Sequence, residues 1–186
     1  MKLGKMTVKK YFLALVIPEP FFEKIESVKQ TLFLEQGLKG ALRSPAHITL
    51  HRPFEWKEEK ENTLIEKLNT FKFSGELQIE LNNFSFFEPR VIYVDVLPSK
   101  ELILLHNSLK NFAKTELKLF NEVTDLRGFH PHVTVASRDL KRPKFYELVP
   151  DFKTKKLNGV FNCNSFCLLK LEKKWEVLHT FDFTYP

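Results

Sequence analysis

The same series of features occurs twice along this chain of 186 residues. Each copy begins with an apolar, strand-like run, continues through a proline and an amphipathic helical segment, and ends in a His-x-Thr motif followed by an aliphatic residue. The apolar runs are Tyr11–Ile17 and Val91–Leu97, and the motifs lie in Ala46–Leu50 and Phe129–Ala136. We interpret this pattern as an internal structural repeat. It predicts two lobes related by a pseudo-twofold axis, with both motif strands at a shared cleft.

Each His-x-Thr motif places the same pair of functional groups on one face of a strand. Successive side chains of a β-strand point to opposite faces, so His47 and Thr49 share one face, as do His132 and Thr134. The aliphatic residues that alternate with them anchor each strand from behind. Two such strands facing each other would offer two imidazoles for acid and base catalysis and two hydroxyls to hold the oxygens of one phosphate.

Apolar periodicity predicts the elements around the motifs. Helices are expected around residues 21–32, 57–70, 102–112 and 145–148, where apolar side chains recur at helical spacing. Pro53 is expected to close the first motif strand. Further strands are predicted at residues 73–87 (with a turn or bulge at Asn82-Asn83), 157–162, 166–171 and 175–183, the last two forming a hairpin.

Composition argues against the glycine-rich phosphate-binding loops of nucleotide-binding proteins. The chain has only 6 glycines, and it contains neither a G-x-G-x-x-G nor a Walker-type sequence. Its formal net charge is +6, and basic residues are concentrated in the last third of the chain. This charge is compatible with a polyanionic partner.

Cysteine content and hydropathy predict a cytoplasmic protein. Cys163 and Cys167 are the only cysteines, too few for a disulfide framework or a zinc cluster, and we expect two buried thiols in a reducing compartment. The apolar run Phe12–Ile17 stops at Pro18 and is too short for the core of a secretory signal or for a membrane span. We therefore expect no membrane association.

The two motifs resemble those of the 2H phosphoesterase superfamily, and more specifically its bacterial branch of 2'-5' RNA ligase-like, RNA 2',3'-cyclic phosphodiesterases. Tyr11–Leu15 with Pro18 resembles the opening strand of that branch, and Phe129–Ala136 resembles its second motif. The resemblance implies an α+β fold for one bilobal domain over residues 1–186, with two antiparallel sheets lining a central cleft and helices on the outside. It also implies a metal-free site, without a cofactor, formed by the two motifs.

The resemblance is imperfect directly after the second motif. The branch often has an arginine after the alanine of that motif, whereas Ser137 stands there in this chain and Arg138 follows. A guanidinium is a fork of hydrogen-bond donors, so Arg138, and Arg52 after the first motif, are candidates to contact phosphate or base; surface salt bridges are the alternative for each.

Two further histidines lie next to the motifs. In a regular strand His51 shares the face of His47, where it either lines the cleft or is solvated. His130 precedes His132 by two residues, which places it on the same face as a candidate substrate contact. No carboxylate or additional histidine lies at metal-ligand spacing, so we expect no metal site.

These observations predict catalytic roles for His47 and His132 and phosphate binding by Thr49 and Thr134. The leading hypothesis is a metal-independent phosphodiesterase that hydrolyses 2',3'-cyclic phosphate ends of RNA or nucleotides, with 2'-5' RNA ligation as the reverse reaction. His132 is expected to be the base and His47 the acid. The alternative hypothesis is a non-catalytic module that binds nucleotides or RNA in the same cleft. Neither hypothesis requires a protein partner, and we expect a monomer.

Overall fold

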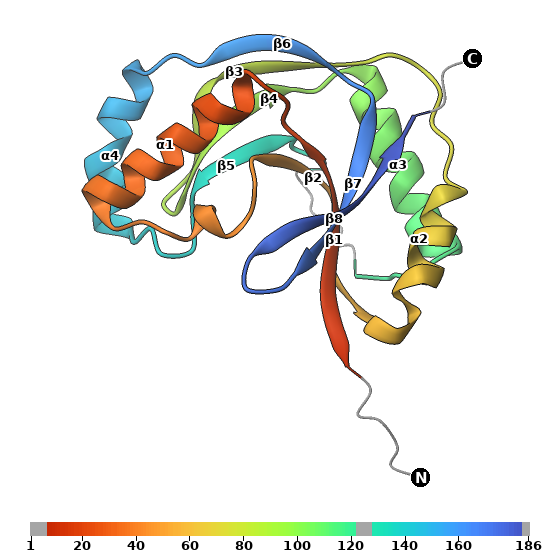
Figure 1. Ribbon diagram of the computed structural model, residues 1–186. Coiled ribbons are helices and arrows are strands. Elements are labelled where there is room, and N and C mark those ends of the chain that lie inside the picture. Colours follow the sequence, from red (N-terminus) through yellow and green to blue (C-terminus); the bar gives the residue numbers. More distant parts are fainter. Residues whose placement is uncertain (1–6, 122–127, 184–186) are drawn as a thin grey trace.

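The framework of the protein is a pair of four-stranded antiparallel sheets (Figure 1). The structure is a computed structural model that describes residues 7–121 and 128–183. The first sheet has the strand order β2-β1-β7-β8, and the second has the order β5-β4-β3-β6. The first sheet consists of β1 (Val8–Val16), β2 (His47–Lys57), β7 (Ser165–Leu171) and β8 (Trp175–Asp182). The second consists of β3 (Leu77–Phe87), β4 (Val91–Leu97), β5 (His132–Ala136) and β6 (Asn158–Cys163).

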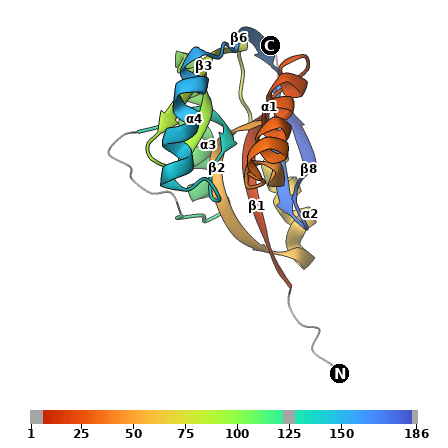
Figure 2. The same ribbon diagram turned by 90° about the vertical axis from the view of Figure 1, so that its left-hand side faces the viewer.

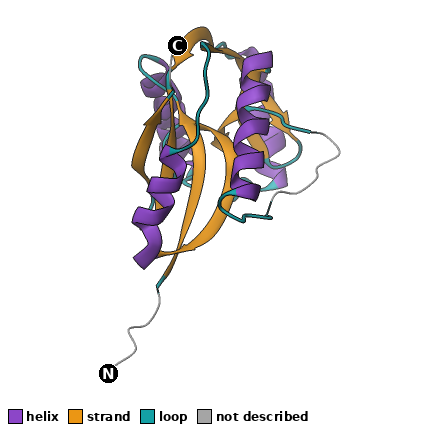
Figure 3. Ribbon diagram, turned by 90° about the vertical axis from the view of Figure 1, so that its right-hand side faces the viewer, coloured by secondary structure: helices purple, strands orange, loops and turns teal. Residues whose placement is uncertain are grey.

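Helices cover the outside of the strands (Figure 3). In the described part of the chain they are α1 (Phe21–Gln36), α2 (Glu61–Asn69), α3 (Lys100–Thr115) and α4 (Arg142–Thr154), with short 3₁₀ helices η1 (Ala41–Arg43) and η2 (Glu58–Lys60). The helices α1 and α4 lie side by side over the second sheet (Figure 2). The predicted α+β class, with two antiparallel sheets and outer helices, is confirmed.

The predicted repeat is present in the way the chain crosses between the sheets. The series β1, α1, β2 corresponds to β4, α3, β5, and both helices have 16 residues. The helix α1 follows a strand of the first sheet but packs against β5 of the second, while α3 follows a strand of the second sheet and packs against β2 of the first. Both motif strands are edge strands, and they contact each other. The crossing therefore brings the two motifs together where the lobes meet.

One buried cluster joins the two lobes. It contains residues of both sheets and of each described α-helix, among them Ile25, Leu64, Leu102 and Phe145, all fully buried. Burying a side chain of this size stabilises the fold by about 1.5–3 kcal/mol. Because this core is shared, we propose that residues 1–186 form one bilobal domain.

The first motif strand continues beyond the proline that was expected to close it. The strand β2 runs through Pro53 to Lys57. An edge strand tolerates proline because it can leave one side of its backbone unpaired, and β2 is an edge strand. The helix predicted from residue 57 consequently begins later, at Glu61.

The helix α4 is longer than the predicted segment 145–148. It spans Arg142–Thr154 and buries a full stripe of apolar side chains. The aromatic members of that stripe, Phe145 and Phe152, pack edge-on against Phe86 and Phe84 of β3. The sequence prediction missed the helix ends because Pro143 and Pro150 obscure them, although a proline is well tolerated in the first turn.

Three smaller expectations can also be compared with the structure. The irregularity predicted at Asn82-Asn83 is a register shift inside β3, and Asn83 has a positive φ of 56°. Cys163 and Cys167 are free and buried, as predicted. Within the described residues, no helix combines the length and the apolar character that crossing a membrane requires.

Candidate active site

The first motif ends in a β-bulge that changes which side chains face the core. Thr49 pairs with Ala14 of β1, but His51 pairs with Leu13, so Leu50 is the extra residue. The predicted alternation holds up to that point, because His47 and Thr49 are half-buried while the aliphatic side chains between them are buried. The bulge then turns the next side chain inward as well.

The second motif repeats this bulge at the same position. Thr134 pairs with Tyr93 of β4, but Ala136 pairs with Ile92, so Val135 is the extra residue. The sequence of half-buried and buried side chains from His132 to Ala136 is identical to that from His47 to His51. The two motifs are therefore the same local structure, with the extra residue directly after the threonine in each.

The bulge corrects two expectations about the residues after the first motif. His51 is 1% exposed, and its Nε2–H donates to Oδ1 of Asn121 at 3.0 Å, so it is a core residue and does not line the cleft. Arg52 is exposed on the strand but is not among the residues that line the cavity described below; Pro53 is. The expectation for His51 assumed a regular strand, which the bulge interrupts, whereas that for Arg52 rested on the chemistry of its guanidinium alone.

Both motif histidines are held by the same backbone contact. The Nδ1 of His47 lies 2.6 Å from the carbonyl oxygen of Pro45, and the Nδ1 of His132 lies 2.8 Å from the carbonyl oxygen of His130. A carbonyl oxygen only accepts, so each Nδ1 carries the hydrogen and donates it. The Nε2 of each neutral imidazole is then left as a proton acceptor.

An aromatic ring from the neighbouring strand packs against each imidazole. The ring of Phe12 on β1 lies 4.9 Å from that of His47, and the ring of Tyr93 on β4 lies 5.1 Å from that of His132. The backbone contact and the ring together restrict the rotation of each histidine. Such restriction keeps catalytic groups in a productive geometry.

His47, Thr49 and Thr134 line one cavity with a volume of about 190 Å³, which we call the active-site cavity. His132 lies beside the cavity, not among its lining residues, yet close enough to His47 that its charge would lower the pKa of His47. The remaining lining residues are Phe12, Gly40, Ala41, Arg43, Ser44, Pro53, Ser137, Arg138 and Trp175.

Arg138 reaches the cavity from a tight turn directly after β5. Its φ is +60°, and the N–H of Asp139 donates to the carbonyl oxygen of Ser137 at 2.7 Å, which closes a γ-turn around it. Oδ2 of Asp139 accepts from the backbone N–H groups of Lys39 and Gly40, at 2.7 and 2.9 Å. The loop before the first motif and the loop after the second are thereby joined at the rim of the cavity.

Only glycine fits at residue 40 in this junction. A Cβ built there would lie 2.5 Å from Oδ1 of Asp139 and 2.6 Å from the carbonyl oxygen of Ser137. Both distances are far below an ordinary van der Waals contact. The absence of a side chain at Gly40 is what allows the two loops to approach.

Burial lowers the pKa of both motif histidines. The pKa of His47 falls to about 4, because burial outweighs the hydrogen bond to Pro45, and the positive charges of Lys29 and His132 lower it further. Burial also lowers the pKa of His132, while its bond to His130 and the carboxylate of Asp95 oppose that change. Both imidazoles are therefore neutral at pH 7, and His47 is the harder of the two to protonate.

A buried lysine lies behind the first motif. Lys29 of α1 is 2% exposed, its Nζ lies 2.7 Å from Oε1 of Glu26, and it donates to the carbonyl oxygen of Ser44 at 3.1 Å. Ser44 immediately precedes Pro45, whose carbonyl accepts from His47. The ammonium therefore fixes the segment that orients His47, and it places a positive charge near the imidazole.

His130 is not among the residues that line the active-site cavity, although its ring lies 6.2 Å from that of His132. Its Nε2 is 3.2 Å from the hydroxyl of Tyr93 and 3.4 Å from Oδ1 of Asp95. Its contribution to the site is its backbone carbonyl, which anchors His132. Over residues 7–121 and 128–183, no group of three or more His, Cys, Asp or Glu side chains is arranged to hold a metal ion.

Sequence reasoning did not identify four residues that shape the site. Phe12 and Trp175 form an aromatic wall, with ring centroids 4.7 Å apart, and Arg43 lines the cavity from η1. Lys29 supports the first motif from a helix whose sequence is amphipathic. Phe12, Lys29 and Trp175 come from elements remote in sequence from the motifs, whereas Arg43 lies four residues before His47 but belongs to no pattern that marks it.

Comparisons with known proteins identify the family of this chain. A model of the family described as "2'-5' RNA ligase superfamily" matches residues 17–175. A protein of Oceanobacillus iheyensis named "Putative phosphoesterase" is 32% identical over 142 residues, which is 74% of this chain and 79% of that protein. A relative of the same name from Geobacillus sp. (strain WCH70) is 27% identical over 142 residues, covering 74% of this chain and 78% of the relative.

Solved structures share the fold over nearly the whole chain. The crystal structure of Escherichia coli LigT complexed with 3'-AMP has a TM-score of 0.66 at 20% identity and covers 96% of this chain and 99% of that one. A protein of Thermus thermophilus has a TM-score of 0.64 at 18% identity and covers 94% of this chain and 97% of that one. At these identities the likeness shows the fold alone.

Proposed function

The chain belongs to the 2'-5' RNA ligase superfamily, and from this membership we propose that its cleft hydrolyses 2',3'-cyclic phosphate ends of RNA or nucleotides without a metal ion. The observation that carries the proposal is the duplicated motif geometry. Each imidazole has its proton fixed at Nδ1 by a carbonyl oxygen. His47 and both threonines line one small cavity, and His132 lies beside it on the same strand as Thr134.

The cavity offers contacts suited to the phosphate. The hydroxyls of Thr49 and Thr134 are donors, and Arg43 and Arg138 supply positive charge from two different loops. Donors and charges held in place before reaction stabilise the charge that develops on the non-bridging oxygens. We therefore assign phosphate binding to the two threonines and charge stabilisation to the two arginines.

Hydrolysis requires one proton to be taken and one to be given. In the proposed step a water oxygen forms a bond to phosphorus, one Nε2 accepts the proton of that water, and the bond from phosphorus to one ribose oxygen breaks. The other imidazole, protonated, gives its Nε2 proton to the departing oxygen. Proton exchange with solvent restores both histidines. Ligation of RNA ends is the same step reversed, with a ribose hydroxyl in place of water.

The pKa order favours His47 as the base and His132 as the acid. Two interacting imidazoles that hold one proton place it on the group of higher pKa. The pKa of His47 is lowered to about 4, whereas Asp95 opposes the lowering at His132. The bound phosphate anion favours protonation of the pair. This assignment is the reverse of the one expected from the sequence, in which His132 is the base and His47 the acid.

The direct test is incubation with a 2',3'-cyclic mononucleotide, with and without a chelator. The proposal expects the ring-opened phosphomonoester at the same rate in both samples. Loss of product in chelator would contradict the metal-independent mechanism. Binding of the nucleotide without product would leave the non-catalytic binding module as the better description.

A further inference from the structure

A second groove opens beside the active-site cavity and shares one wall with it. Its volume is about 460 Å³, and Arg43, Ser44 and Trp175 line both spaces. Pockets that hold a small organic ligand have volumes of roughly 300–1,000 Å³. The active-site cavity alone, at about 190 Å³, is smaller than this range. A substrate larger than the reacting group therefore has to extend beyond the cavity, and the neighbouring groove, which we call the side groove, lies directly across the shared wall.

The side groove combines an apolar surface with positive charge. Besides Trp175 on the shared wall, its apolar lining comes from four residues of four different segments, namely Phe22, Leu42, Pro45 and Val177. Val177 is 45% exposed on the edge strand β8, which is high for a valine in a strand. The cations are Lys174, which precedes β8, and Arg43 on the shared wall. The apolar surface suits the flat face of a nucleobase, and the positive charge suits the phosphate that links two nucleotides.

We propose that the side groove binds the nucleotide that precedes the reacting 3' end of an RNA chain. The proposal rests on the proposed function and specifies its substrate as an oligonucleotide end. The reacting cyclic phosphate occupies the active-site cavity, the internucleotide phosphate crosses the shared wall beside Arg43, and the preceding base lies against Leu42 and Val177.

The carboxylates of the side groove are consistent with this occupant. Glu26 is paired with the buried ammonium of Lys29 at 2.7 Å, which offsets its negative charge. Glu176 is exposed, and its carboxylate can accept a hydrogen bond from a ribose hydroxyl or from an exocyclic amine of a base. The positive charges of Arg43 and Lys174, which line the same groove, remain to attract the linking phosphate.

The test compares two substrates that differ by one nucleotide. We expect the wild-type protein to have a higher kcat/KM for a dinucleotide that ends in a 2',3'-cyclic phosphate than for the matching cyclic mononucleotide. Val177→Glu places a carboxylate on the apolar surface and should lower the ratio of the two kcat/KM values at least about fivefold, the lower end of what one stacked base contributes. Lys174→Glu should lower the ratio in the same direction by repelling the linking phosphate.

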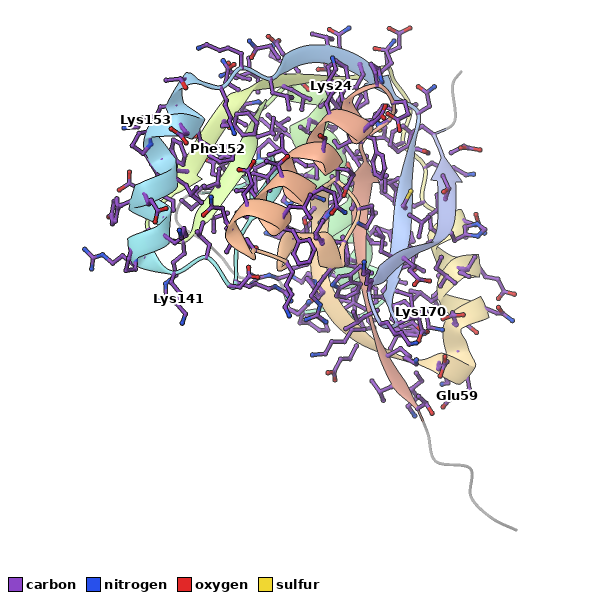
Figure 4. All side chains as sticks on the ribbon, turned by 60° about the vertical axis from the view of Figure 1, so that its left-hand side comes forward. Lys24, Glu59, Lys141, Phe152, Lys153 and Lys170 are labelled. Atoms are coloured by element: carbon purple, nitrogen blue, oxygen red, sulfur yellow. The ribbon has the colours of Figure 1, made fainter. Side chains whose placement is uncertain are left out.

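Each variant has a control matched in residue type and exposure. Val160 of β6 is 49% exposed at the edge of the other sheet, so Val160→Glu makes the same change on a comparable surface. Lys153 lies on the outer side of α4, so Lys153→Glu makes the same charge change away from the groove (Figure 4). Both controls should keep the wild-type ratio. Equal kcat/KM values for the two substrates in the wild type, or an unchanged ratio in Val177→Glu, would overturn the proposal.

A binding measurement separates this inference from the proposed function. If the wild-type protein hydrolyses neither substrate, the fluorescence anisotropy of a 5'-labelled oligonucleotide with a cyclic phosphate end still reports occupancy of the groove. Tighter binding of the oligonucleotide than of the competing mononucleotide, weakened by Val177→Glu and not by Val160→Glu, would support the groove although catalysis had failed. Equal binding of both ligands would overturn it.

Discussion

The Nδ1 of His47 lies 2.6 Å from the carbonyl oxygen of Pro45, two residues earlier in the chain. This one contact fixes the tautomer of the imidazole without help from the other lobe. The second motif makes the equivalent contact between His132 and His130 at 2.8 Å. Each half of the chain therefore orients its own motif histidine locally, and the crossing of α1 and α3 between the sheets brings the two motif strands together.

The first prediction concerns the two histidines as a unit. His47→Ala and His132→Ala should each lower kcat/KM for the cyclic phosphate by about 10²–10⁴, the usual contribution of a positioned acid or base. The double variant should lose much less than the product of the two effects, because residues that act together are not additive. Steady-state assays with a cyclic nucleotide measure all three variants. His179→Ala on β8 is the control and should have wild-type kinetics; a near-normal rate for either motif variant would refute paired-histidine catalysis.

The second prediction distinguishes the acid from the base. In a nucleoside phosphodiester with a p-nitrophenyl group, the p-nitrophenolate leaves without being protonated. Hydrolysis of this substrate therefore needs a base but no acid. On this substrate His132→Ala should recover most of its rate relative to wild type, while His47→Ala should remain impaired. Release of p-nitrophenolate is followed by its absorbance. The opposite pattern would restore His132 as the base, and recovery in neither variant would mean that both histidines act on the attacking water.

The third prediction concerns stability against pH. The pKa of His47 falls from its ordinary value of 6.5 to about 4 in the folded protein, so between these values the unfolded chain binds more protons than the folded one. The free energy of unfolding should therefore fall as the pH is lowered from 6.5 to 4, by up to about 3 kcal/mol from this group. Urea unfolding at several pH values measures it. His47→Gln removes the titrating group and should flatten the dependence; an identical slope in the variant would contradict the lowered pKa.

The fourth prediction concerns the threonine hydroxyls. Thr49→Val and Thr134→Val keep the shape and strand preference of the side chain but remove the donor, so each should cost about 1.5–3 kcal/mol of transition-state stabilisation, the value of one hydrogen bond to a charged group. Unfolding midpoints should change little, because both side chains are half-buried at the cavity surface. Thr180→Val on β8 is the matched strand control. An unchanged kcat/KM in both motif variants would mean that the hydroxyls do not contact the phosphate.

The sequence predicted the parts of this structure that depend on local pattern and missed those that depend on backbone irregularity or distant packing. The repeat follows from the order of apolar, helical and motif segments along the chain. The shared face of His47 and Thr49 and the buried aliphatic residues behind them follow from strand alternation. The inward turn of His51 does not, because a bulge after Thr49 is set by pairing with β1. Phe12 and Trp175 reach the site from elements far from either motif in sequence, and only the folded arrangement brings them there.

The fifth prediction concerns Lys29, whose ammonium acts on the site through His47. Lys29→Met preserves the length of the side chain but removes its bond to the Ser44 carbonyl oxygen and its charge. Since that charge lowers the pKa of His47, the pKa should rise toward its ordinary value of 6.5. The other charged groups around this imidazole, Arg43, Arg138 and His132, remain in place. NMR titration of labelled histidine measures the change.

The control for Lys29→Met is Lys24→Met, which removes an exposed lysine of the same helix that lies over the ring of Phe21. We expect Lys29→Met to lose about 1–3 kcal/mol of stability, the cost of leaving a buried acceptor unpaired. The carboxylate of Glu26 is partly exposed, so it can regain hydration and limits that loss. A purely structural role would lower stability without moving the His47 titration, whereas a positioning role moves the titration and, with it, the acid limb of kcat/KM toward higher pH. A loss of stability with an unchanged His47 titration would therefore reduce Lys29 to a structural residue.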